Sequence, residues 1–472
     1  MTTATDHRGE SLVVWFRRDL RVHDLPALLE AVTADRLVPL FVVDPALWDA
    51  PRTSPVRRWF LAGSLVALDA ALRQRGSRLI VRRGRPEAVV PAVARETGAR
   101  SVLVTRDVTP GGRRRDRAVA AALAADGRTL QGRQGLLLAE PEALAGRSGA
   151  GHTVFSPFWR ALAAADRRAL LPAPEWLPPL PDDIASEPLP REPHPGLVDL
   201  PEPGEAAARA RLDAWVADGL AAYGDRRNEL AGQPTSRLSQ DLHLGLLSPL
   251  EIEARCGGPG GAEAFRRQLG WRDFHHHLLW WRPELARAPF QPRLQAALRV
   301  ESDDPAAAQA WREGRTGIPV VDAGMRQLAA TGWLPNRARL IVASFLTRHL
   351  LLDWRIGEDH FMRTLVDGDV ANNVGGWQWT AGVGTDAQPW FRIFNPVLQG
   401  ERFDADGTWV RAWVPELAAL PPAVIHHPWS LSPTEQRAAG VVIGRDYPAP
   451  LIDLAEGRER ALAAFKAASG TP

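Results

Sequence analysis

The chain has 472 residues, 45% of them hydrophobic and 24% charged, a composition typical of a folded globular protein that excludes a disordered or fibrous one. Its formal net charge of +2 excludes a wholly basic surface, so contact with nucleic acid would need a local basic patch. The single cysteine, Cys256, excludes a disulfide framework and a thiolate zinc site.

Neither the first residues of the chain nor its most apolar stretch suggests export or a membrane. Residues 1–11 are polar and lead into an apolar strand without a hydrophobic signal core. The longest apolar stretch, residues 340–354, contains Arg348 and His349 and is shorter than the roughly 20 residues that cross a bilayer. We therefore expect a cytoplasmic protein.

The first third of the chain alternates short apolar runs with helical patterns. The expected strands are residues 12–16, 37–43, 78–81 and 101–105, with helices at 57–75, 86–97 and 113–125. This order predicts an α/β domain with a doubly wound parallel sheet over residues 10–135. Residues 16–21, Phe-Arg-Arg-Asp-Leu-Arg, stand where a dinucleotide-binding fold would have its glycines, which argues against a nicotinamide dehydrogenase.

Proline marks the next segment. Residues 172–203 contain 11 prolines in 32 positions, which predicts an interdomain connector over residues 136–203. Helical patterns follow at residues 205–220, 238–245, 262–280, 305–313, 320–331, 337–354 and 358–366. No comparable strand pattern returns, so residues 204–472 are expected to form an all-α domain.

Residues 367–379 form the densest cluster of polar and aromatic groups. They contain two aspartates, two asparagines and two tryptophans but few good helix formers. Such a segment offers hydrogen bonds to a polar ring system, with indoles available for stacking. A surface turn carrying two core tryptophans is the alternative that composition leaves open.

Two further clusters have simpler alternatives. The hydroxyls of residues 235–239 suit a phosphate cradle, although, taken alone, the run is better explained by a helix N-cap. The run His275, His276 and His277 is not expected to bind a metal, because successive residues of a helix point about 100° apart. Cys256 and the scattered serines and histidines form no pattern typical of a nucleophile and its base.

Several motifs together resemble the DNA photolyase/cryptochrome family over nearly the whole chain. They are residues 14–21 (VWFRRDLR), 235–239 (TSRLS), 271–274 (WRDF) and 317–401, the last including 332–339 (GWLPNRAR) and 391–396 (FRIFNP). The resemblance is nearest to the class I, microbial branch that repairs cyclobutane pyrimidine dimers. Residues 317–401 are long enough to make it specific.

The resemblance implies an α/β domain with an optional antenna chromophore and a helical domain that binds FAD. The implied activity is that of a lyase: photoexcited reduced FAD gives an electron to a flipped-out dimer in UV-damaged DNA, single- or double-stranded, and the protein is expected to be a monomer. A cryptochrome-like blue-light sensor with little repair is the alternative. A flavoprotein with neither activity is a third.

The residues that match the family's FAD contacts are Tyr223, Thr235, Ser236, Arg237, Leu238, Ser239, Gln268, Arg272, Trp333, Asn336, Arg339, Asp367, Asp369 and Asn373. Among these, the resemblance places Asn373 beside the flavin N5 atom. It also pairs Arg339 with Asp367 near the flavin ring.

The residues that match the family's lesion pocket are Trp271, Asn336, Trp379 and Gln268, and those that match its DNA contacts are Arg227, Trp271, Arg337, Trp379 and Arg392. Two positions depart from the family pattern. Gln268 stands where such photolyases usually have a glutamate, and Leu340 stands where a methionine is common. Glutamine still forms hydrogen bonds, but it supplies neither charge nor a proton to the dimer.

The family's photoreduction wire of three tryptophans matches only in part. Trp377 and Trp354 take the first two places, and Glu301 stands at the third, so the last step would use Trp280, Trp281 or Trp311, or the wire is truncated. Residues 105–112 lack the Asn and Glu contacts of a folate antenna. A deazaflavin antenna, or none, is therefore favoured.

Overall fold

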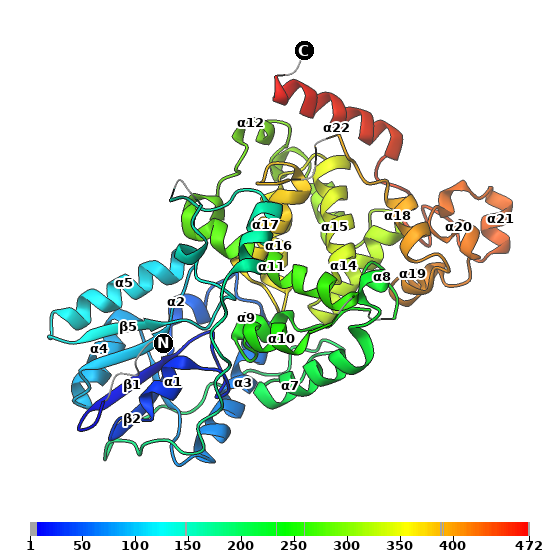
Figure 1. The fold of residues 1–472 in the computed structure, drawn as a ribbon. Helices are drawn as coiled ribbons and strands as arrows, with labels where there is room; N and C mark the ends of the chain where they lie inside the picture. Colours follow the sequence, from blue (N-terminus) through cyan, green and yellow to red (C-terminus); the bar gives the residue numbers. More distant parts are fainter. Residues whose placement is uncertain are drawn as a thin grey trace.

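The computed structural model describes residues 7–146, 149–232, 234–258, 260–387, 389 and 391–470. Its N-terminal part contains a parallel sheet in the order β3-β2-β1-β4-β5 (Figure 1). The strands are β1 (Ser11–Phe16), β2 (Arg36–Val43), β3 (Ile80–Arg83), β4 (Ser101–Thr105) and β5 (Thr129–Arg133). The expected doubly wound sheet is confirmed. Strand β5 was missed because its polar, partly exposed sequence is that of an edge strand.

Alternate residues of β1 face two different cores, because successive side chains of a strand point to opposite faces. Val13 and Trp15 pack against α4 (Pro86–Glu96) and α5 (Pro110–Ala124). Leu12, Val14 and Phe16 pack with α1 (Pro26–Ala31) and α3 (Pro55–Arg73) in a core that continues into the helical part of the molecule. The second of these two cores is therefore common to the α/β part and the helical part.

The strand order reverses between β1 and β4, so the loop after β1 leaves the sheet at a topological switch point. This loop reaches the helical part through hydrogen bonds. The backbone N–H of Leu20 donates to the Leu244 carbonyl (3.2 Å), and Arg21 Nη1 donates to the Gly245 carbonyl (2.9 Å). The contacts bring Arg18 of the same loop close to helices that lie more than 200 residues later in the chain.

The segment between the two parts is mostly irregular. It contains the 3₁₀ turn η1 (Pro141–Leu144) and helix α6 (Phe155–Ala164), and residues 165–204 form no helix or strand. Its backbone is nevertheless tied to both sides: Leu177 donates to the Arg75 carbonyl (2.8 Å) and Val198 to the Ala330 carbonyl (2.9 Å). Helix α6 was not predicted from the sequence.

The rest of the chain is helical, and its described residues contain two isolated bridges but no strand. Its main helices are α7 (Glu205–Ala214), α8 (Tyr223–Arg226), α9 (Ser239–Leu244), α10 (Pro249–Arg255), α11 (Gly261–Trp281), α12 (Pro292–Gln295), α13 (Pro305–Arg312), α14 (Pro319–Thr331), α15 (Asn336–Ser344), α16 (Trp354–Thr364), α17 (Val370–Ala381), α18 (Pro396–Phe403), α19 (Thr408–Trp413), α20 (Pro422–Ile425), α21 (Pro433–Ala438) and α22 (Leu454–Ser469). Helices α11, α15, α16 and α17 lie together in the centre of this part (Figure 1). None of the described helices is both long and apolar enough to cross a bilayer.

The single helix predicted for residues 337–354 is wrong. Helix α15 continues into a π-helical turn, η5 (Phe345–His349), and then stops. Leu351 adopts a left-handed backbone conformation (φ 55°), which breaks the helix, and the Asp353 side chain caps a new one by accepting from the Arg355 N–H (2.9 Å). Trp354 therefore begins α16 instead of ending α15.

Candidate active site

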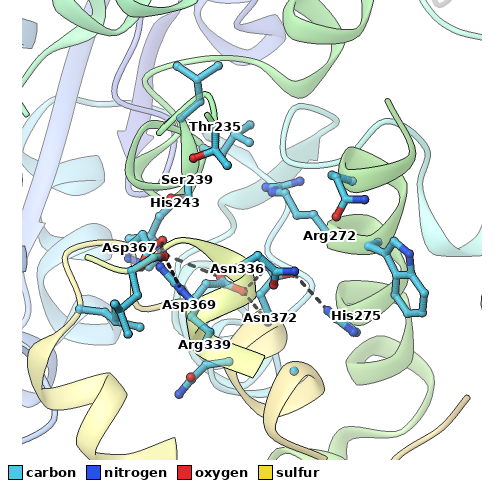
Figure 2. Close-up of a pocket in the computed structure, with 18 of the residues that line it drawn as sticks. Thr235, Ser239, His243, Arg272, His275, Asn336, Arg339, Asp367, Asp369 and Asn372 are labelled. Atoms are coloured by element: carbon cyan, nitrogen blue, oxygen red, sulfur yellow. Dashed lines mark hydrogen bonds and ion pairs between the residues drawn. The ribbon is translucent and has the colours of Figure 1, made fainter. Parts of the chain in front are cut away.

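A cavity of about 340 Å³ lies in the centre of the helical part. Figure 2 shows Thr235 and Ser239 on one side of it, Asp367 and Asp369 on a second side, and Arg272 and His275 of α11 on a third. All fourteen residues expected to contact FAD line it: Tyr223, Thr235, Ser236, Arg237, Leu238, Ser239, Gln268, Arg272, Trp333, Asn336, Arg339, Asp367, Asp369 and Asn373. The fold thus brings together positions from five separate stretches of sequence.

The stretch from Thr235 to Ser239 enters the cavity just before α9. The N-cap of α9 is Leu238, and no side chain caps the helix, so the N-cap interpretation of this run is wrong. The Thr235 hydroxyl is buried without a hydrogen-bond partner among the described residues. Arg237 has a φ of 49°, which is uncommon for a residue other than glycine. Uncapped N–H groups and a free hydroxyl are what a phosphate group would bind.

Residues 367–379 form a helix instead of the surface turn that composition left open. Asp369 caps α17: its Oδ1 accepts from the backbone N–H of Asn372 (3.0 Å) and from Asn372 Nδ2 (2.8 Å). Its Oδ2 accepts from Arg18 Nη2 (2.6 Å) and lies 3.5 Å from His276 Nε2. Burial alone would raise the pKa of Asp369, but His276 and Arg18 hold it well below its usual range. Asp369 is therefore a carboxylate at neutral pH.

Asp367 is the second carboxylate of the cavity. Arg339 Nη2 donates to its Oδ2 (2.8 Å), so the pair expected from the sequence is present, and Arg339 Nε donates to the Leu334 carbonyl (2.9 Å). Asp367 Oδ1 is buried and has no hydrogen-bond partner among the described residues. A buried acceptor without a donor is costly, so this oxygen fits a ligand that carries an N–H or O–H group.

Asn373 presents a defined atom to the cavity. Its Nδ2 donates to the Glu358 carbonyl (2.9 Å) and to Glu358 Oε1 (3.1 Å). Burial raises the pKa of Glu358, although Arg52 beside it has the opposite effect. Because the amide nitrogen is already bonded to Glu358, Oδ1 is the polar atom that Asn373 offers to a ligand.

Helix α11 contributes one continuous face. The cavity is lined by Gln268 and by the residues three, four and seven positions after it, which are Trp271, Arg272 and His275. His275 Nδ1 lies 3.3 Å from Asn372 Oδ1, and the amide nitrogen of Asn372 is already bonded to Asp369. His275 Nδ1 is therefore the donor of this hydrogen bond. Burial lowers the pKa of His275 to about 4, so the ring is neutral.

The remaining predicted site residues are not part of the cavity lining. Among the described residues, its lining does not include Trp379, Trp354, Arg227, Arg337 or Arg392. Trp379 lies half-buried on α17, two residues after Trp377. Arg337 donates to Asn228 Oδ1 (2.8 Å) and its guanidinium lies 4.5 Å from the Phe403 ring, whereas Arg392 is exposed. Their roles toward DNA stay predictions.

Trp377, Trp311 and Trp354 are buried in the helical part, and one of them lines the cavity. Trp377 lines the cavity and packs on α16 at Gly357, where a Cβ atom would lie 2.0 Å from its ring. Trp311 is fully buried with its ring 6.0 Å from that of Trp377, centroid to centroid. Trp354 lies three residues before Gly357 and donates its N–H to Gln295 Oε1 (2.9 Å). Trp311 is thus in ring contact with Trp377, and Trp354 lies on the helix against which Trp377 packs.

Glu301, at the expected third place of the wire, lies in a 3₁₀ turn and forms a two-point ion pair with Arg312 (2.7 and 2.8 Å). Arg312 directly follows Trp311 in α13. Of the other indoles considered, Trp280 is stacked under the Arg113 guanidinium (3.8 Å) at the α/β domain. Of the candidate indoles Trp280, Trp281 and Trp311, only Trp311 is in ring contact with Trp377 among the described residues.

Sequence reasoning assigned no role to several residues that line the cavity, among them Arg18, His243, His275 and Asn372. Arg18 belongs to the motif at residues 14–21, but nothing in the sequence places that loop next to α17. Asn372 directly precedes an assigned asparagine. His275 was considered only as a metal ligand, and the described residues hold no group of three or more metal-binding side chains.

Comparisons with known proteins agree with this geometry. A family model described as DNA photolyase matches residues 12–178, and one described as the FAD binding domain of DNA photolyase matches residues 265–467. The chain is 46% identical to a deoxyribodipyrimidine photo-lyase of Streptomyces griseus over 95% of this chain and 97% of that protein. It is 40% identical to one of Agrobacterium fabrum over 98% of each.

Solved structures show the same fold. A bacterial class III photolyase from Agrobacterium tumefaciens superposes with a TM-score of 0.92, at 39% identity and full coverage of both chains. A cryptochrome of Synechocystis sp. superposes with a TM-score of 0.88, at 32% identity and 98% coverage of this chain and 100% of that one. The sequence, the fold and the cavity agree, and the chain belongs to the DNA photolyase family.

Proposed function

We propose that this protein repairs cyclobutane pyrimidine dimers in DNA in a light-dependent reaction, with reduced FAD as the electron donor. The observation that carries the proposal is the central cavity, where the Trp271 indole meets two buried polar atoms, the Thr235 hydroxyl and Asp367 Oδ1, that have no hydrogen-bond partner among the described residues. Near-full-length relatives named deoxyribodipyrimidine photo-lyase support it. The matches include a class III photolyase, whereas the motifs favour class I, and the class stays a prediction.

The cavity suits FAD. The residues from Thr235 to Ser239 would hold its phosphates, and Asp367 with Arg339 would lie at its ring system. Bound FAD would supply light absorption and a single electron. The protein would orient it, exclude water and keep a positive charge, Arg339, close to the ring.

The dimer would bind at the α11 side of the same cavity. Trp271 would stack against it, and Gln268 and Asn336 would form hydrogen bonds with it. Stacking contributes about 1–3 kcal/mol per base, comparable with the few kcal/mol needed to extrude a damaged base. Trp379 is proposed as the second indole. Ring opening by electron transfer needs no general acid, which agrees with His243 and His275, whose pKa values burial lowers to about 4.

The rest of the proposal concerns partners. UV-damaged DNA, single- or double-stranded, would be gripped by Arg227, Arg337 and Arg392, and the protein would act as a cytoplasmic monomer. A deazaflavin antenna, or none, is favoured over folate. The region at the topological switch point of the sheet is charged, because the guanidinium groups of Arg17 and Arg115 lie 4.7 and 5.2 Å from the Trp15 ring.

The test is blue light on the purified, reduced protein with an oligonucleotide that carries one dimer. Restoration of the intact pyrimidines in the light, none in the dark, and loss of repair in Trp271→Ala are the expected results. The similarity to the Synechocystis cryptochrome makes a light sensor the second candidate. Reversible photoreduction without restored pyrimidines would favour the sensor and overturn the repair proposal.

A further inference from the structure

Trp271 is stacked on another aromatic ring on the side away from the cavity. Phe155 lies parallel to it, with ring centroids 3.9 Å apart and an interplanar angle of 7°. Phe155 is 2% exposed and, unlike Trp271, is not among the described residues that line the cavity. Phe155 therefore covers one face of the indole, and the part of Trp271 that borders the cavity is not the part that Phe155 covers.

Two more rings contact the same indole. Phe274 meets it in a T-shaped contact (5.6 Å, 83°), and the His275 ring lies 5.8 Å away at 48°. Both residues come from α11, the helix that carries Trp271 itself. Phe155 is different because it comes from α6, more than 100 residues earlier in the chain. The orientation of the indole thus depends on how α6 packs on α11.

The packing of α6 on α11 is close. A Cβ atom on Gly270, the residue before Trp271, would lie 2.6 Å from the Trp159 ring of α6. Trp159 continues the stack behind Phe155 (6.4 Å, 18°), and the Arg267 guanidinium of α11 lies over both rings (5.3 and 5.6 Å). Only glycine at position 270 lets the two helices approach this far.

A hydrogen bond ties the same residue to the other wall of the cavity. The backbone N–H of Phe155 donates to Asp386 Oδ2 (3.0 Å). Asp386 lies in the loop after α17, the helix that carries Asn372, Asn373 and Trp377. The first residue of α6 therefore contacts α11 through the Trp271 ring and the loop that follows α17 through Asp386.

We propose that Phe155 is a positioning residue for the dimer: it fixes the plane of the Trp271 indole so that its open face is ready to stack. The proposal rests on the proposed function and gives the connector at residues 136–203 a part in lesion recognition. An indole stacked on Phe155 and in contact with two further rings loses little freedom when a base stacks on it, so less binding energy is spent on ordering it. Without the rear ring, the side chain has more orientations to lose.

The test compares Phe155→Leu with Phe158→Leu. Phe158 lies on the same helix and is as deeply buried, but among the described residues its ring contacts are with His152, Phe274 and His277 and do not include Trp271. For each holoenzyme, dark dissociation constants are measured for a dimer-containing oligonucleotide and for its undamaged counterpart, with FAD content and Tm alongside.

We expect Phe155→Leu to lower the preference for the dimer roughly 2- to 10-fold, the range for loss of one aromatic pair, with FAD content and binding of undamaged DNA unchanged. Phe158→Leu should lower Tm by a similar amount and keep the preference. In a Trp271→Ala background, Phe155→Leu should change the preference no further, because the two residues act through one contact. Phe155→Met keeps most of the apolar volume and should give the same direction of change if the leucine variant does not fold.

Two different failures are distinguishable. If the wild-type protein shows no preference for the dimer, the proposed function itself fails. If the wild type prefers the dimer and Trp271→Ala removes that preference, but both Phe155 variants behave like Phe158→Leu, the function stands and the positioning role is refuted.

Discussion

The ion pair between Arg18 and Asp369 gives a sharp test of how the first domain supports the cavity. Arg18 comes from the loop after β1, and its Nη2 donates to Asp369 Oδ2 (2.6 Å). The side chains are 23% and 8% exposed. Replacing Arg18 with glutamine removes the charge and keeps a polar side chain of moderate length. It leaves Asp369 a buried carboxylate with one cation fewer.

The size of the effect follows from burial. Removing one partner of a fully buried pair costs about 3–5 kcal/mol, whereas an exposed pair contributes about 0–1 kcal/mol. Asp369 is buried, but solvent reaches Arg18, and the two donors of Asn372 remain. We therefore expect a loss of about 2 kcal/mol in the free energy of unfolding, about a 30-fold change in the folded-to-unfolded ratio.

Urea unfolding of the purified protein measures this loss, and flavin absorbance relative to protein measures FAD occupancy, which should fall because Arg18 lines the cavity. The matched control is Arg82→Gln, whose partner Glu96 (2.8 Å) is 41% exposed, and it should lose less than about 0.5 kcal/mol. An Arg18→Gln protein that matches this control in stability and keeps full FAD occupancy would refute the reasoning.

Three further predictions concern charge, pH and electron transfer. Gln268→Glu should increase the quantum yield of dimer repair several-fold, measured under limiting light as dimers restored per absorbed photon, because a glutamate adds a negatively charged acceptor to the cavity; an unchanged or lower yield would contradict this. Burial lowers the pKa of His277 to about 4, so between pH 6.5 and pH 4 the folded state binds fewer protons than the unfolded state. The stability that the neutral His277 contributes above pH 6.5 is therefore lost as the pH falls toward 4. Relative to His277→Gln, the wild type should lose about 1.4 kcal/mol per pH unit in that window by urea unfolding, and a constant difference would contradict the burial argument. Trp354→Phe should shorten the lifetime of the radical pair that forms after excitation of the oxidised holoprotein. Trp311→Phe should change the decay of this radical pair only if the ring contact between Trp311 and Trp377 carries charge. Long-lived, complete photoreduction of the flavin in Trp354→Phe would exclude the proposed wire.

Local sequence was enough to predict most of the elements. Apolar runs identify β1, β2 and β4, and the cluster at residues 367–379 identifies a wall of the cavity. Errors arose where tertiary contacts override local pattern. The polar edge strand β5 is held by pairing with β4, and the helix predicted for residues 337–354 is broken by a left-handed Leu351 that apolar periodicity does not reveal.

The sequence by itself determined which chemical groups are present: hydroxyls at Thr235 to Ser239, carboxylates at Asp367 and Asp369, amides beside them, and an excess of tryptophan with almost no net charge. Only the tertiary structure decided which of these groups meet. It brought Arg18 to Asp369 across 351 residues, placed Phe155 behind Trp271, and left Trp379 outside the cavity lining. Side-chain chemistry is a property of each residue, whereas contacts between distant segments depend on how helices and sheet pack, which no local pattern encodes.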